Sequence, residues 1–162
     1  RLLKMAYLAD VPVVIVHLSS LDGLLEIRAA RARGQKVYVE SCPHYLLLDD
    51  SRYSEPDFAG AKYVCSPPLR KQRDIDALWQ ALEGGEIDTI GTDHCSFRYE
   101  PTKMLGKDDF SAIPGGCLHP QAVAPGFQMY TCWMIRHLDG DPWLQTTRNE
   151  DERYLWLHDA QE

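Results

Sequence analysis

Several extended segments of this chain end in side chains of the kind that carry out chemistry. His17 follows a β-branched run, His44 and Ser66 each follow another extended segment, and Asp93 and His94 follow a short apolar one. An acidic residue and an imidazole just beyond the carboxyl end of a buried strand occupy the position where α/β proteins place their functional groups. In a (β/α) barrel such positions converge on one face, so their regularity predicts a shared site.

Each of these residues also has a purely structural interpretation. Asp93 could cap a following helix, and His94 could pack locally. His17 could be a buried histidine that is satisfied by the backbone. His44 follows Pro43, which suggests a rigid turn, so we interpret His44 as packing at the strand end and leave it out of the site.

The elements that must position these groups alternate between extended and helical segments. The β-branched run 11–16 predicts a parallel strand that is buried on both faces. Residues 21–33 have helical spacing, with Ser20 as the N-cap and Gly34 at the end, and residues 36–40 predict a second strand. A strand, a helix and a strand with short connections form a βαβ unit, so the fold class is α/β.

Four further ordered segments and two loops are expected along the chain. The helices are 1–10 and 73–82, the strands are 61–65 and 87–92, and the irregular loops are 46–60 and 98–116.

The composition is ordinary for a soluble globular protein, with 44% hydrophobic and 25% charged residues. The 17 basic and 24 acidic residues give a net charge of −7, which argues against nucleic acid or an anionic membrane as the main partner. No apolar run has the length of a membrane span, and no signal-peptide pattern opens the chain. The five cysteines form no CxxC pair, so neither a zinc knuckle nor a disulfide scaffold is indicated, and a cytoplasmic location is expected.

Five motifs occur in a fixed order along the chain. They are residues 16–20 (VHLSS), 40–46 (ESCPHYL), 61–70 (AKYVCSPPLR), 91–95 (GTDHC) and 109–116 (DFSAIPGG). In this order they resemble the dihydropyrimidinase/hydantoinase branch of the cyclic amidohydrolases. The resemblance covers residues 1–117, and the ordered set is specific although no single motif is.

The resemblance implies the C-terminal part of a (β/α)8 TIM-type barrel that holds two divalent metal ions, usually zinc. The implied reaction opens a small cyclic amide or imide, such as a dihydropyrimidine or a 5-substituted hydantoin, by attack of a metal-bound hydroxide. The complete enzyme would be a homo-oligomer, a tetramer. Two alternatives remain open: an allantoinase-type hydrolase, which shares the Cys-Pro-His-Tyr string, and a non-catalytic dihydropyrimidinase-like protein. The presence of His17 and Asp93 favours an enzyme.

The resemblance also implies roles for individual residues. His17 matches the metal-ligand histidine of the sixth barrel strand, and Asp93 matches the aspartate after the eighth strand, which binds metal and shuttles the proton. Ser66 matches the serine that hydrogen-bonds the ring amide. Gly115 falls where many members have an asparagine, and its main chain would make the contact with the substrate. His94 is expected to orient Asp93 or another ligand.

The implied ligand set is incomplete in this chain. The family's His-x-His pair, carboxylated lysine and further histidine are expected upstream of Arg1, and no His-x-His occurs here. We therefore expect a chain that begins inside a domain and is inactive alone. Residues 1–117 are interpreted as a partial barrel and residues 118–162 as a divergent, atypical tail that is loosely packed.

Overall fold

The computed structural model describes residues 1–93, 95 and 97–116. In this part of the chain helices and strands alternate, which confirms the α/β class. The elements are α1 (Leu2–Ala9), β1 (Val13–Ile15), α2 (Leu21–Ala32), β2 (Val37–Ser41), α3 (Pro43–Leu47), α4 (Gln72–Glu83) and β3 (Thr89–Ile90). Short 3-10 turns occupy Asp50–Ser54, Ala59–Tyr63, Lys103–Gly106 and Phe110–Ala112. The tail 118–162 and His94 lie outside the described residues.

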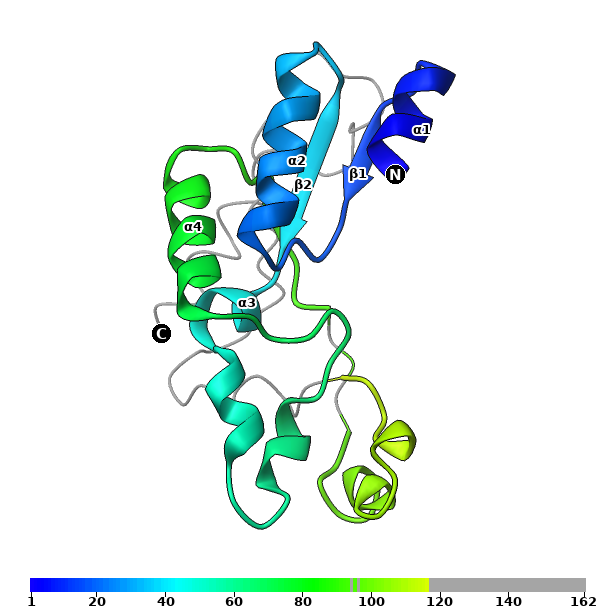
Figure 1. Ribbon diagram of the computed structural model, residues 1–162, viewed down its shortest axis with the longest axis vertical. Coiled ribbons are helices and arrows are strands. Elements are labelled where there is room, and N and C mark those ends of the chain that lie inside the picture. The colour runs from blue at the N-terminus through cyan, green and yellow to red at the C-terminus, as the bar shows by residue number, and fades with distance from the viewer. Residues whose placement is uncertain (94, 96, 117–162) are drawn as a thin grey trace, which may run out of the picture.

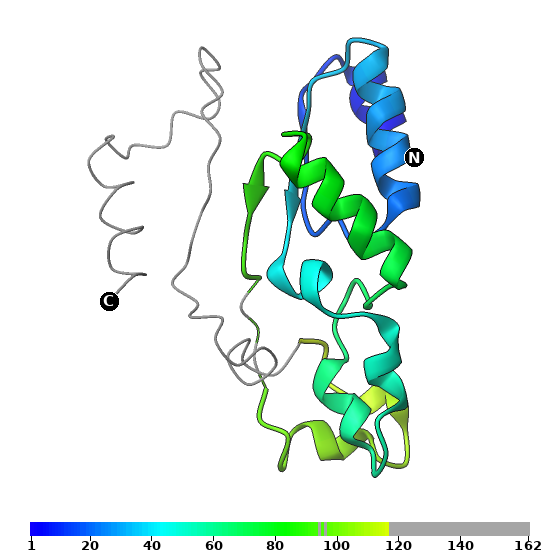
Figure 2. The ribbon, with the colours of Figure 1, turned by 90° about the vertical axis from the view of Figure 1, so that its left-hand side faces the viewer.

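The three strands form one parallel sheet in the order β1-β2-β3 (Figure 1). Val13 pairs with Val37 at one end, and Ser41 pairs with Ile90 at the other. Helix α2 connects β1 to β2, as the sequence predicts for a βαβ unit. Helices α2 and α4 lie along the same face of the sheet (Figure 2).

The hydrophobic core lies between these two helices and the strands. Leu24 and Leu78, from α2 and α4, are 0% exposed, and Val39 of β2 is 1% exposed. Burial of each large aliphatic side chain contributes about 1.5–3 kcal/mol. This packing fixes the strands against the helices and so fixes where the strands end. No helix in the described part of the chain is long and apolar enough to cross a membrane.

The side of β1 that carries Val14 is exposed, contrary to the prediction of a strand buried on both faces. Val14 and Val16 are 51% and 50% exposed. Within the described residues β1 pairs with β2 alone, and α1 buries only Ala6. A continuous apolar run indicates that a strand could be buried on both faces. Here no described element covers the side of β1 that carries Val14.

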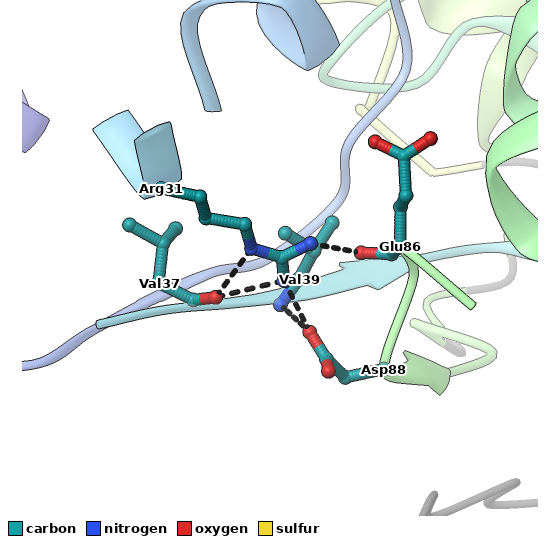
Figure 3. A network of polar contacts seen from close by, with 5 residues as sticks. All are labelled: Arg31, Val37, Val39, Glu86 and Asp88. Carbon is teal, nitrogen blue, oxygen red and sulfur yellow. Dashed lines mark hydrogen bonds and ion pairs between the residues drawn. The ribbon is translucent and has the colours of Figure 1, made fainter. Parts of the chain in front are cut away.

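At the amino-terminal end of the sheet, Arg31 ties α2 to two strand segments (Figure 3). Its Nε and Nη2 donate to the carbonyl of Val37 at 3.0 and 2.8 Å. Its Nη1 donates to the carbonyl of Glu86 at 2.7 Å, and its Nη2 donates to Asp88 Oδ2 at 2.7 Å. The same carboxylate oxygen accepts the backbone N–H of Val39 at 2.8 Å. We call these five residues the Arg31 clamp: Arg31, its partners Val37, Glu86 and Asp88, and Val39, which bonds to Asp88.

Two predicted strands differ from the structure. Only Thr89–Ile90 of segment 87–92 is a strand, and just before it the carboxylate of Asp88, not its main-chain carbonyl, accepts the N–H of Val39. The strand predicted at 61–65 is wrong, since a 3-10 turn covers Ala59–Tyr63. Gly60 packs so closely on Tyr53 that a Cβ atom would lie 2.5 Å from its carbonyl oxygen, which favours a tight turn over an extended segment.

Candidate functional site

His17 and Asp93 lie side by side beyond the carboxyl ends of β1 and β3. His17 Nε2 is 3.5 Å from Asp93 Oδ1, and the two side chains are 30% and 42% exposed. Their predicted proximity is therefore confirmed. Their role as metal ligands stays a prediction.

Both residues have a left-handed backbone conformation, with φ of 56° at His17 and 44° at Asp93. This conformation is uncommon for residues that carry a Cβ atom, and it recurs at functional sites. The other non-glycine residues with positive φ in the described part are Asp10, Asp57 and Phe58, which lie at the end of α1 and in turns. At His17 and Asp93 this backbone turns the chain sharply just after a strand.

Ser41, at the end of β2, joins the two segments that carry this pair. Its Oγ donates to the carbonyl of Leu18 at 2.7 Å, and its own carbonyl accepts the N–H of Gly91 at 3.0 Å. Ser41 is 0% exposed, so water does not compete for these bonds. Leu18 follows His17 directly, and Gly91 precedes Asp93 by two residues. The bonds of Ser41 therefore help to set the distance between the imidazole and the carboxylate.

Three further titratable groups interact with the pair. Burial raises the pKa of Glu40. The charge of His17 lowers this pKa, and the charge of Asp93 raises it. Burial lowers the pKa of His44 from 6.5 to about 4, and this imidazole also interacts with Asp93 and His17. Burial, reinforced by the charges of Glu40 and Asp93, raises the pKa of the Cys42 thiol, so this cysteine stays protonated.

Glu40 is the residue of this group that sequence reasoning missed. Its carboxyl group lies over Gly91, where a Cβ atom would come within 2.8 Å of Glu40 Cδ and Oε2. A charged residue at the end of a strand of β-branched and aromatic residues was the signal that could have identified it.

The two predicted substrate contacts, Ser66 and Gly115, are both exposed and lie on neighbouring segments. The N–H of Gly116 donates to the carbonyl of Val64 at 3.0 Å, which holds these segments together. Cys95 Sγ lies 3.8 Å from the carbonyl oxygen of Gly115. Because Cys95 belongs to the segment that follows β3, these bonds connect the substrate contacts to the strand end.

The two adjacent glycines have different surroundings. Gly116 has φ of 145°, and a Cβ atom there would lie 2.0 Å from the carbonyl oxygen of Cys95, so only glycine fits. At Gly115 no atom of the described residues, its two chain neighbours aside, lies within 4 Å of the Cβ position. There is room here for a side chain, such as the asparagine that many members of the family that this chain resembles carry at this position.

The pair of donors fits part of a metal site. A neutral imidazole nitrogen and a carboxylate oxygen are both ligands that zinc accepts in proteins. Within the described residues, no group of three or more His, Cys, Asp or Glu side chains is arranged to hold a metal ion. His17 and Asp93 could thus supply two ligands, and the remaining metal ligands would have to come from outside the described residues.

No family model matches this chain. A D-hydantoinase from Streptomyces coelicolor is 43% identical over 116 residues, which are 72% of this chain and 25% of the relative. A D-phenylhydantoinase from Escherichia coli is 45% identical over 117 residues, with the same two shares. The crystal structure of a dihydropyrimidinase from Brevibacillus agri has a TM-score of 0.70 and 46% identity, again over 72% of this chain and 25% of that one.

These comparisons confirm the predicted resemblance and its partial extent. The chain spans about a quarter of the length of the curated relatives it matches. The matched 72% of this chain is therefore related to the dihydropyrimidinase/hydantoinase branch of the cyclic amidohydrolases.

Proposed function

We propose that this chain is part of a metal-dependent hydrolase that opens cyclic amides of the hydantoin or dihydropyrimidine class. The observation that carries the proposal is the approach of His17 Nε2 to Asp93 Oδ1, 3.5 Å apart at the carboxyl ends of two parallel strands. The names of the relatives, D-hydantoinase and D-phenylhydantoinase, support this substrate class. The presence of both donors favours an enzyme over a non-catalytic relative.

We propose that β1, β2 and β3 are the last three strands of a (β/α)8 barrel, with residues 1–117 as its C-terminal part. The parallel order of the strands and the placement of α2 and α4 on one face support this arrangement (Figure 2). In a closed barrel, the face of the sheet opposite the helices points into the interior and is filled by side chains from the other strands. Such side chains would also cover Val14 and Val16, which are exposed on the side of β1 away from the core, and a neighbouring strand would pair with the open edge of β1.

The donor set of His17 and Asp93 fits one part of a centre of two divalent ions, for which we propose zinc. When bound, such ions supply a hydroxide at neutral pH and polarise the carbonyl of the scissile amide. The remaining ligands, among them a carboxylated lysine, would be contributed by the rest of the protein. The complete enzyme is proposed to be a cytoplasmic homo-oligomer, and the 162-residue chain is proposed to be inactive alone.

The residues of this chain would share the other tasks. Asp93 is 42% exposed, so its carboxylate is accessible to a substrate. It would take the proton of the attacking nucleophile and return it to the ring nitrogen as the C–N bond breaks. The hydroxyl group of Ser66 and the main chain of Gly115, both exposed, would hydrogen-bond the polar edge of the ring and hold its carbonyl in line for attack.

Exchange of the matched segment tests this proposal. The 116 matched residues of the Streptomyces coelicolor D-hydantoinase are replaced by the corresponding residues of this chain. With zinc, this hybrid enzyme should hydrolyse a 5-substituted hydantoin, whereas the 162-residue chain alone should not. His17→Ala and Asp93→Asn should each abolish turnover, and Glu26→Gln, on the exposed side of α2, should not.

Circular dichroism and zinc content show whether each variant is folded and loaded. A hybrid enzyme that keeps its turnover after Asp93→Asn would show that Asp93 has no catalytic role. Robust turnover by the 162-residue chain alone would contradict the expected ligand count.

A further inference from the structure

Lys103 is a buried charged residue that the proposed chemistry does not use. It is 0% exposed and opens the 3-10 turn Lys103–Gly106, in a segment that the sequence predicts to be an irregular loop. Burying an ammonium group is costly unless it is compensated by acceptors. A lysine in this position is therefore expected to have a specific task.

The ammonium group of Lys103 contacts separate parts of the chain, among them the segments of Val64, Pro114 and Phe97. Nζ donates to the carbonyl of Val64 at 2.8 Å and to the carbonyl of Pro114 at 2.6 Å. It also lies 5.7 Å from the centroid of the Phe97 ring. Hydrogen bonds from a charged donor are about twice as strong as those between neutral groups. One side chain thus connects segments that are far apart in the sequence.

The two carbonyls lie next to the proposed substrate contacts. Val64 precedes Ser66 by two residues, and Pro114 directly precedes Gly115. We propose that Lys103 is a positioning residue, whose ammonium group sets the distance between Ser66 and Gly115 so that both can reach one cyclic amide. This role rests on the proposed function, because it assigns Lys103 a task in substrate binding.

The expected effect is on substrate binding, because Ser66 and Gly115 are proposed to hydrogen-bond the ring. The loss of one hydrogen bond to the ring should weaken substrate binding about tenfold. Lys103→Met keeps most of the length and apolar volume of the side chain but removes the donor to both carbonyls. The matched control is Lys107→Met, because Lys107 lies just beyond the same turn and is exposed.

Amide hydrogen exchange on the 162-residue chain tests the connection itself. The N–H of Gly116 bonds to the same carbonyl of Val64 as Lys103 does, at 3.0 Å. Lys103→Met should speed exchange at Gly116 about tenfold or more. The N–H of Gly91, which bonds to Ser41 at the strand end, should be unaffected, and Lys107→Met should change neither. Unchanged exchange at Gly116 in Lys103→Met would overturn the proposal.

Steady-state kinetics of the hybrid enzyme test the consequence for the substrate. Lys103→Met should raise KM for a 5-substituted hydantoin about tenfold, because roughly one hydrogen bond between the ring and Ser66 or Gly115 is lost, and kcat should stay within about threefold of the parent. A lysine with a merely structural role would instead lower the folded fraction, which reduces kcat at unchanged KM, and that result would overturn the proposal. If the hybrid enzyme with Lys103 intact shows no turnover, the proposed function fails, and exchange at Gly116 still decides whether Lys103 ties the two segments.

Discussion

Arg31 and Arg28 lie one turn apart on α2 and both bond to Glu86, yet we expect them to contribute very different stability. The Arg31 side chain is 28% exposed and pairs with Asp88, whose side chain is 11% exposed. It also donates to the backbone carbonyls of Val37 and Glu86 (Figure 3). Among the residues that the structure describes, Arg28 forms only a bidentate ion pair with the side chain of Glu86, at 2.7 and 2.6 Å, and these side chains are 42% and 31% exposed.

The substitution Arg31→Met removes the donor to both carbonyls and leaves the Asp88 carboxylate without its ion pair. Breaking a buried ion pair costs about 3–5 kcal/mol, and water at the partly exposed guanidinium offsets some of this loss. We therefore expect the free energy of unfolding to fall by about 2–4 kcal/mol. Arg28→Met should lower it by less than about 1 kcal/mol, because an exposed ion pair contributes little.

Urea unfolding followed by circular dichroism gives both values on the same chain. Added salt should weaken the contribution of Arg28 more than that of Arg31, since exposed pairs are screened more strongly. Asp88→Asn added to Arg31→Met should recover part of the loss, because the amide oxygen can still accept the N–H of Val39 without an unpaired charge. Equal losses for Arg31→Met and Arg28→Met would refute the Arg31 clamp as a source of stability.

Three other predictions concern single residues near the site. Gly115→Ala should change the free energy of unfolding by less than about 1 kcal/mol. Gly116→Ala should lower it by more than about 2 kcal/mol, because its Cβ atom would lie 2.0 Å from the carbonyl oxygen of Cys95. Similar losses for the two variants in urea unfolding would contradict the described loop. Burial lowers the pKa of His44 from 6.5 to about 4, so the unfolded chain takes up a proton before the folded chain does. The contribution of neutral His44 to the free energy of unfolding is complete above pH 6.5, and about 3 kcal/mol of it is lost as the pH falls toward 4. Parallel pH profiles of this free energy for the native chain and for His44→Gln would refute the prediction. Burial raises the pKa of the Cys42 thiol, which is 0% exposed, so iodoacetamide at pH 8 should modify the exposed Cys95 at least about tenfold faster; equal rates in peptide mass spectrometry would disagree with the burial of Cys42.

The elements with strong local signals could be predicted from the sequence. Ser20 caps α2 as expected, since its Oγ accepts the N–H of Gly23 at 3.2 Å. The helix predicted at 73–82 is α4, Gln72–Glu83, and β2 covers Val37–Ser41 where 36–40 was predicted. Apolar periodicity, helix caps and β-branched runs are signals that lie within a few residues of one another, so they can be recognised in the sequence.

Features that depend on distant partners could not be read in this way. The segment 61–65 has strand-like residues, but the structure forms a turn there because Gly60 packs on Tyr53. Lys103 looks like a solvent-exposed loop residue, yet it is buried and bonds to the carbonyl of Val64, 39 positions away. Neither contact has a signal within its own segment.

The site was predictable in part. The repeated placement of polar residues after extended segments, together with the family resemblance, predicts that His17 and Asp93 lie close together, and they do. Their left-handed backbone and the buried bonds of Ser41 come from the packing of three strand ends and were not predictable from spacing. The proximity of Glu40 to His17 and Asp93 also depends on this packing and was not predictable from spacing.

Anomalous diffraction at the zinc edge, on crystals of the hybrid enzyme, would test most directly whether His17 and Asp93 are metal ligands. We predict anomalous density about 2.0–2.2 Å from a ring nitrogen of His17 and from a carboxylate oxygen of Asp93. Zinc that is bound only by residues of the relative, with both of these side chains outside bonding distance, would contradict the proposal.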